Sequence, residues 1–173
     1  MSKILKFPKD FLWGSATSAY QAEGGIENND WATPHQKIGG GPAGRACDHY
    51  NLYEKDFDLI KSLNQNAHRF SIEWSRIEPE EGKFDEKEIE HYRKVLLALK
   101  SRGIKIMLTL HHFTNPLWLA EIGSWENPNV VFYFSRFAKR IFSGYFDFVD
   151  FWITINEPLF YASNCYLEGS WPP

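Results

Sequence analysis

Apolar and polar residues follow two different patterns along this chain. Short runs of apolar and β-branched residues are typical of buried strands, and longer segments with apolar residues at helical spacing are typical of helices that bury one face. Strands are predicted at 11–16, 67–74, 105–111 and 148–155, and helices at 48–63, 85–102 and 129–145. Strands that alternate with helices in this way indicate a parallel α/β architecture.

Residues that favour helix ends and loops separate these segments. Asp48 is placed to cap the first predicted helix, and Gly103 follows the end of the second. The segment 24–45 is polar and contains Gly39-Gly40-Gly41-Pro42, so we expect a surface loop there. Because no buried strand precedes this glycine run and no helix follows it directly, a nucleotide-binding phosphate loop is not indicated.

The fourth predicted strand ends in the most informative residues of the chain. The apolar run 150–155 leads directly into Asn156, Glu157 and Pro158. In (β/α) barrels the catalytic groups lie in the loops that follow the strands, so a carboxylate in this place indicates a hydrolase. A surface glutamate that merely ends a strand is the commoner case in general, but the buried strand before it favours the catalytic interpretation.

Together with other segments, this motif resembles the glycoside hydrolase family 1 β-glucosidases. The matching segments, in chain order, are Phe11–Gly24, Ala46–Tyr50, Arg69–Arg76, Thr109–Pro116 and Thr154–Pro158. They cover the chain nearly from end to end, and the main local departure is Phe113 where the family commonly has tryptophan. The resemblance implies a retaining β-glycosidase that hydrolyses the O-glycosidic bonds of β-glucosides or oligosaccharides.

The resemblance also implies the fold: the N-terminal half of a (β/α)8 TIM barrel, with about four strands and three helices. A complete barrel needs roughly 250 residues, whereas this chain has 173. We therefore expect residues 1–173 to form a single incomplete barrel domain that is cut in the loop after strand four. The nucleophile would then lie in the half that is absent, and we expect none in this chain.

The family's site residues map onto four positions here. The resemblance makes Glu157 the proton donor, or acid/base, and Gln21, His112 and Asn156 the residues that bind the substrate. An amide at 156 can donate to the sugar's 2-hydroxyl. Gln21 and His112, expected at the ends of strands one and three, offer donors and acceptors that match vicinal hydroxyl groups. His111 is expected to have a structural role beside His112.

Other residues are expected to support this site. An acid that works near neutral pH needs a raised pKa, and Trp152, Phe160 and a second carboxylate would raise the pKa of Glu157 by desolvation and repulsion. The resemblance places Arg69 beside the missing nucleophile, so in this chain we expect its charge to be uncompensated or to face water. Trp118 is a candidate for the border of the sugar-binding cleft.

Composition excludes several other functions. A net charge of -3 without a basic cluster gives no reason to expect a nucleic-acid partner, and no apolar run approaches the ~20 residues that span a membrane. Cys47 and Cys165 form neither a disulfide framework nor a metal spacing, so no metal or cofactor is expected. The first residues lack the pattern of a signal peptide, and we expect a cytoplasmic protein.

Three hypotheses remain open from the sequence. The chain is one part of a glycosidase completed by a complementary C-terminal half-barrel, a non-catalytic half-barrel that binds a sugar or a partner, or an inactive fragment. By itself, half a barrel leaves the outer edges of strands one and four unpaired, which favours self-association.

Overall fold

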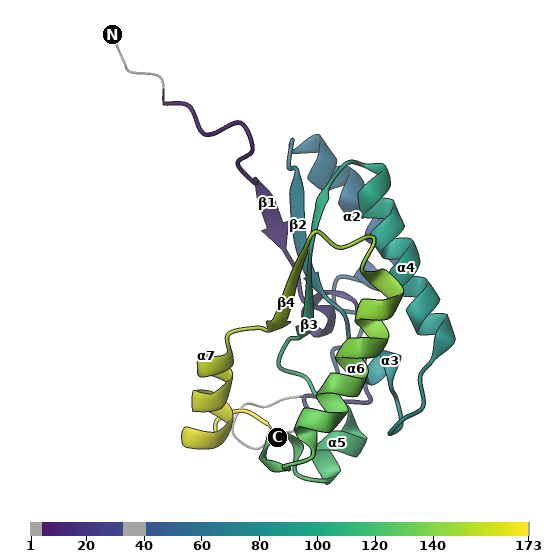
Figure 1. Cartoon of the computed structure of the whole chain (residues 1–173), viewed down its shortest axis with the longest axis vertical. Helices are drawn as coiled ribbons and strands as arrows, with labels where there is room; N and C mark the ends of the chain where they lie inside the picture. The colour runs from purple at the N-terminus through teal and green to yellow at the C-terminus, as the bar shows by residue number, and fades with distance from the viewer. Residues whose placement is uncertain (1–4, 33–40, 173) are drawn as a thin grey trace.

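The computed structural model describes residues 5–32 and 41–172. Four parallel strands form one sheet in the order β1-β2-β3-β4, namely β1 (Gly14–Ala16), β2 (Ala67–Ser71), β3 (Lys105–His111) and β4 (Phe151–Ile155). Three long helices connect them and cover one face of the sheet (Figure 1), namely α2 (His49–Ser62), α4 (Glu86–Ser101) and α6 (Val130–Tyr145). The predicted parallel α/β architecture is confirmed, and its form is a partial α/β barrel.

Short helical segments follow the strands and form the end of the molecule that carries the candidate site (Figure 1). They are α1 (Ala19–Ala22), α3 (Trp74–Ile77), α5 (Leu117–Glu121), the 3-10 turn η1 (Ser124–Glu126), α7 (Pro158–Ala162) and the π-helical turn η2 (Ser163–Leu167). Because the strands are parallel, all these segments follow the carboxyl ends of strands and therefore meet at one edge of the sheet.

Three strands begin or end at different residues from those predicted. β1 begins at Gly14 instead of Phe11, and the other two differ for reasons of local hydrogen bonding. β2 stops at Ser71 because the side chain of Glu73 accepts a hydrogen bond from the backbone N–H of Ser75 and so starts α3. β4 begins only at Phe151, after Asp150 has accepted hydrogen bonds from Lys105 Nζ at 2.7 Å and from the backbone N–H of Ile106 at 2.9 Å.

The expected cap at Asp48 is only partly right. Asp48 does precede α2, but its backbone is left-handed at φ 55° and its side chain does not cap the helix. Its carboxylate instead accepts from the side chains of Arg45 and Asn51. A side-chain cap is present at α4, where Asp85 accepts from the backbone N–H groups of Lys87 and Glu88.

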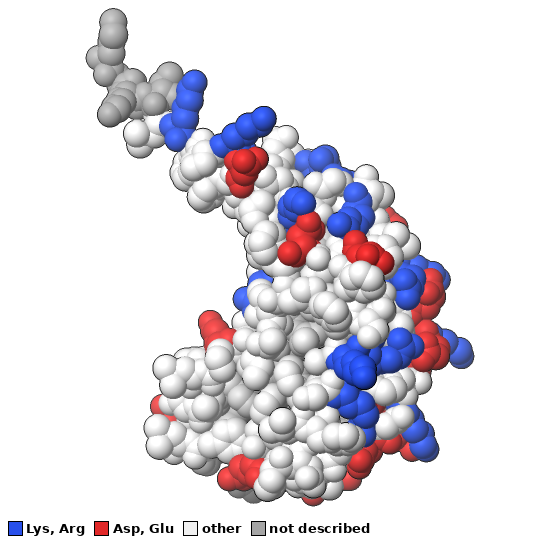
Figure 2. Space-filling view, viewed as in Figure 1, with Lys and Arg blue, Asp and Glu red and all other residues white. Residues whose placement is uncertain are grey.

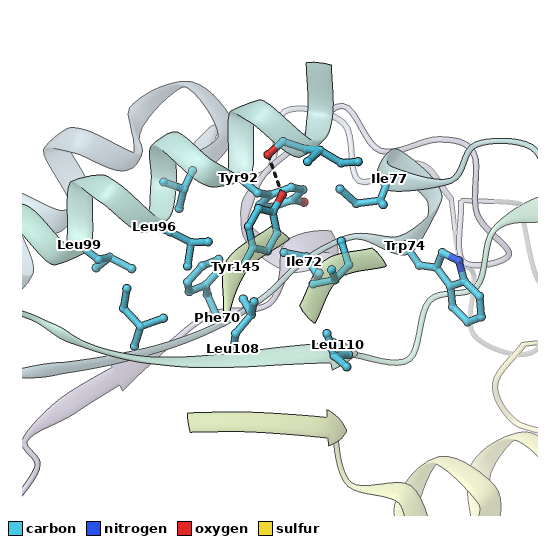
Figure 3. Close-up of a cluster of buried hydrophobic side chains, with 14 of the residues drawn as sticks. Phe70, Ile72, Trp74, Ile77, Tyr92, Leu96, Leu99, Leu108, Leu110 and Tyr145 are labelled. Atoms are coloured by element: carbon cyan, nitrogen blue, oxygen red, sulfur yellow. Dashed lines mark hydrogen bonds between the residues drawn. The ribbon is translucent and has the colours of Figure 1, made fainter. Parts of the chain in front are cut away.

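The hydrophobic core lies between the helices and one face of the sheet (Figure 3). Side chains alternate between the two faces of a strand, and Phe70 of β2 and the even-numbered residues of β3, such as Leu108, belong to this core. Tyr145 from α6 closes it by donating a hydrogen bond from its hydroxyl to the backbone oxygen of Ile89 at 2.6 Å. The helix-covered face is therefore packed across α4, α6 and the sheet.

The other face of the sheet carries the odd-numbered residues. Arg69, Met107 and Phe151 lie side by side in one row of neighbouring strands, and Phe151 is exposed. Most of β4 is half-buried or exposed, whereas most of β3 is buried. One side of the sheet is thus covered by helices, and the other is open toward β4.

We predict that neighbouring positions on β3 differ sharply in their contribution to stability. Leu108→Ala removes a fully buried side chain from the core and should lower the free energy of unfolding by about 2–5 kcal/mol. Met107→Ala, the matched control on the open face, should cost about 1 kcal/mol because its side chain is only half-buried. Urea denaturation of both variants measures this, and equal losses would mean that the odd-numbered face is also covered.

Candidate functional site

Gln21 and His112 line the same cavity at the carboxyl edge of the sheet. His112 follows directly after β3, as expected. Gln21 lies not at the end of β1 but on the short helix α1, because the strand already stops at Ala16. The cavity has a volume of about 320 Å³ and is lined by Ser18, Tyr20, Gln21, Trp31, Gly41, His112, Phe113, Thr114 and Trp171.

His112 presents a neutral imidazole to this cavity. Burial lowers its pKa to about 4, and the positive charge of Arg69 contributes in the same direction. At neutral pH one ring nitrogen therefore donates and the other accepts. Its Nδ1 is buried and has no hydrogen-bond partner within the described part of the chain, so the ring retains capacity to bind a ligand.

Asn156 is held by the protein through both its backbone and its side chain. Its backbone N–H donates to the backbone oxygen of His111 at 2.9 Å, and its Oδ1 accepts a hydrogen bond from Arg69 Nη2. Gln21 is held similarly, because its Oε1 accepts from the hydroxyl of Ser18. One acceptor position of each amide oxygen is occupied in this way, and both side chains can offer a ligand their NH2 donors.

Arg69 is less isolated than expected. Its Nε donates to Thr109 Oγ1 at 3.0 Å, in addition to the bond to Asn156. Among residues 5–32 and 41–172 no carboxylate forms an ion pair with it. Arg69 is half-buried, and its guanidinium donates to neutral oxygens. Its positive charge is not neutralised by these partners and would stabilise an anion placed beside it.

Glu157 starts α7 in a strained conformation. Its φ is 41° and its ψ is 58°, in the left-handed region, which non-glycine residues rarely adopt and which costs on the order of 1 kcal/mol. Pro158 takes the first position of the helix, where its missing N–H is not needed. The backbone N–H of Tyr161 then donates to the backbone oxygen of Glu157 at 2.9 Å.

The side chain of Glu157 is not enclosed as expected. It is exposed, and so are Leu159 at 84% and Phe160 at 52% of their surface. It lines a surface hollow with Pro158, Leu159, Phe160 and Ser163, separate from the cavity of Gln21 and His112. Its apolar neighbours are thus open to solvent with it and do not enclose the carboxyl group as the sequence predicted.

Trp118 lies away from the cavity. It belongs to α5, donates from Nε1 to the backbone oxygen of Glu78 at 2.9 Å, and packs edge-to-face against Trp74. Neither ring lines the cavity. Its aromatic walls come instead from Tyr20, Trp31, Phe113 and Trp171, which lie in loops or on a short helix and therefore show no periodic pattern in the sequence.

The segment expected to be a polar surface loop is partly buried. Asn29 and Asp30 have 0% and 7% of their surface exposed, and the antiparallel bridge between Asn29 and Pro116 ties this segment to the one after β3. The middle of the predicted loop, with Gly39 and Gly40, lies outside the described residues. Both residues are buried with partners: Asn29 Oδ1 accepts from the backbone N–H groups of Trp31 and Ala32, and the carboxylate of Asp30 accepts from Asn115.

The described residues contain neither a metal-binding group nor a membrane-spanning helix. Residues 5–32 and 41–172 contain no group of three His, Cys, Asp or Glu side chains arranged to hold a metal ion. Within the same ranges no helix is long and apolar enough to cross a membrane.

Known proteins are similar to this chain in both sequence and fold. Residues 4–173 match the family described as Glycosyl hydrolase family 1. Beta-glucosidase A of Acetivibrio thermocellus is 40% identical over 168 residues, which cover 91% of this chain and 37% of that protein. The chain thus spans about two fifths of the length of the curated relatives.

Solved structures show the same similarity. A β-glycosidase from Pyrococcus horikoshii is 40% identical with a TM-score of 0.89, over 98% of this chain and 40% of that one. The β-glucosidase from Thermotoga maritima in complex with castanospermine is 35% identical with a TM-score of 0.91, over 96% of this chain and 40% of that one. The fold described above therefore corresponds to part of a larger glycosidase barrel.

We predict that removal of the Arg69 charge will raise the pKa of His112. Arg69→Met removes the repulsion, but burial, the larger cause, remains, so the pKa should rise from about 4 and stay below the ordinary value of 6.5. Histidine-labelled NMR titration measures it. Arg102→Met, which removes a cation paired with Glu54 and Asp58, is the control and should leave His112 unchanged. An unchanged pKa in Arg69→Met would contradict the arrangement.

Proposed function

The chain belongs to glycosyl hydrolase family 1, and from this premise we propose that it supplies the acid/base half of a retaining β-glycosidase that hydrolyses β-glucosides. The observation that carries the proposal is the position of Asn156 and Glu157 at the carboxyl end of β4, on the same edge of the sheet as the cavity of Gln21 and His112. Residues 1–173 then form one incomplete barrel domain.

In the proposed reaction Glu157 is the proton donor. It protonates the leaving oxygen while a nucleophile carboxylate about 5–5.5 Å away attacks the anomeric carbon, and it then takes a proton from the water that releases the sugar. The NH2 groups of Gln21 and Asn156 and the imidazole of His112 bind the hydroxyls of the sugar. Arg69 stabilises the ionised nucleophile.

The nucleophile has to come from another part of the barrel. Two carboxylates near the site are already committed: Glu23 forms an ion pair with Arg76 at 2.9 Å, and Glu73 accepts hydrogen bonds from Ser75 and Thr114. Both are buried, and burial raises the pKa of each. A carboxyl group that is buried and whose oxygens already accept hydrogen bonds from the protein is a poor nucleophile.

A complementary half-barrel is the partner that fits the open side. Among the described residues β1 and β4 each pair with one neighbouring strand only. Exposed apolar side chains gather on β4, α7 and η2, namely Phe151, Leu159, Phe160 and Leu167. Figure 2 shows that Lys, Arg, Asp and Glu gather over the helices, whereas the hollowed side above α7 carries few charges. Covering it would pair the strand edges and surround Glu157 with protein.

A cytoplasmic location is part of the proposal. Cys47 and Cys165 are both unpaired, and Cys47 is exposed, an arrangement suited to a reducing compartment.

Loss of the acid should affect substrates according to their leaving groups. In a complete barrel made by joining this chain to the remaining part of a family 1 relative, Glu157→Gln should lower kcat by about 10²–10⁴-fold for poor leaving groups. It should have a small effect for activated aryl glucosides, which need little protonation. Steady-state assays with both substrates measure this. Glu168→Gln, an exposed control in the following turn, should have no effect, and equal losses on both substrates would contradict the acid role.

The isolated chain should neither turn over substrate nor remain a monomer. Glu23 and Glu73 are already bound within the described part of the chain, and the strand edges favour self-association. Phe151→Lys, which places a charge on the edge strand, should shift the chain toward monomer. Size-exclusion chromatography with light scattering, followed by an aryl-glucoside assay of each peak, tests both statements. A monomeric wild-type chain with Glu157-dependent turnover would contradict them.

A further inference from the structure

Asn115 lies at the centre of a buried hydrogen-bond network beside the proposed acid. It has no exposed surface. Its Oδ1 accepts from Trp125 Nε1 at 2.9 Å and lies 3.0 Å from His111 Nε2. Its Nδ2 donates to Asp30 Oδ2 at 2.7 Å and to the hydroxyl of Tyr161 at 2.9 Å. Both acceptor positions and both donor hydrogens of the amide are therefore used.

Asp30 fixes Asn115 from the side of β1. Its Oδ1 accepts from the backbone N–H of Asn115 at 2.9 Å, and its own backbone N–H donates to the backbone oxygen of Asn115 at 3.0 Å. No cation forms an ion pair with Asp30 within the described ranges. Burial raises the pKa of Asp30 to about 7, and the hydrogen bonds from Asn115 are what offset the cost of burying it.

Tyr161 fixes α7 from the other side. It is the buried residue of this five-residue helix, which is too short to be stable by itself. Its ring lies 5.3 Å from His111 and 6.0 Å from Phe113, between ring centroids. Its backbone N–H holds the carbonyl of Glu157, the residue in the left-handed conformation. The direction of the Glu157 side chain thus depends on where Tyr161 is held.

We infer that Asn115 is a positioning residue for Glu157: by binding Asp30 and Tyr161 together it holds α7 against β3 and keeps the left-handed turn that aims the carboxylate of Glu157. The inference rests on the proposed role of Glu157 as proton donor. Only an amide serves here, because a carboxylate at 115 would face that of Asp30 and would lose both donors, and an apolar side chain would leave Asp30 and Tyr161 without the partner that joins them.

Hydrogen exchange of the 173-residue chain tests the holding of α7. Tyr161→Phe removes only the hydroxyl, and Asn115→Asp keeps the shape of the side chain. Each should speed amide exchange in 159–168 by about tenfold, as expected when Tyr161 loses its buried hydrogen bond from Asn115, while β2 and β3 stay protected. Asn127→Asp, the same change at a residue whose side chain bonds to the backbone of Ile122 and Asn129, is the control. Unchanged exchange in both test variants would overturn the inference.

The complete barrel described above tests the consequence for catalysis. Asn115→Asp and Tyr161→Phe should each lower kcat for poor leaving groups by about tenfold, with little change for activated aryl glucosides and in KM. A purely structural role would lower both rates together. If Glu157→Gln leaves the leaving-group dependence unchanged, the proposed function fails. If Glu157→Gln alters that dependence and neither test variant does, only the inference about Asn115 is wrong.

Discussion

Parallel pairing of the four strands is the constraint on which the rest of the structure depends. It places every strand's carboxyl end at one edge, so that Gln21, His112 and Glu157 come from distant parts of the sequence to the same end of the molecule. Parallel strands need crossover helices, and these cover only one face here (Figure 1). The same constraint thus gathers the site and leaves one side of the sheet uncovered.

Much of the fold could be read from local patterns. The strand at 105–111 has its predicted bounds, and α2, α4 and α6 differ from the predicted helices by one residue at each end or less. The errors at β2 and β4 arose where a single side chain decides the boundary, as Glu73 does after β2. Hydrophobic periodicity contains no information about such side-chain hydrogen bonds, so the sequence extended β2 to residue 74.

The candidate site was less predictable than the fold. The family resemblance pointed to Gln21, His112, Asn156 and Glu157, whose roles stay predictions. No sequence pattern predicted that Asn115 binds Asp30, because the two residues are 85 positions apart and bind through polar atoms. The exposure of Glu157 could not be foreseen either: the apolar contacts expected around it depend on what covers α7, not on its neighbours in the chain.

The left-handed backbone of Glu157 has an evolutionary consequence. Glycine adopts such a conformation without the steric cost of a side chain, and asparagine tolerates it better than most residues. Selection for stability alone would therefore favour glycine or asparagine at position 157, and either residue would remove the carboxyl group. Where glutamate is kept at this position, its chemistry outweighs the cost of the less favourable backbone. Replacement of Glu157 by glycine in a related chain would therefore indicate relaxed selection on catalysis.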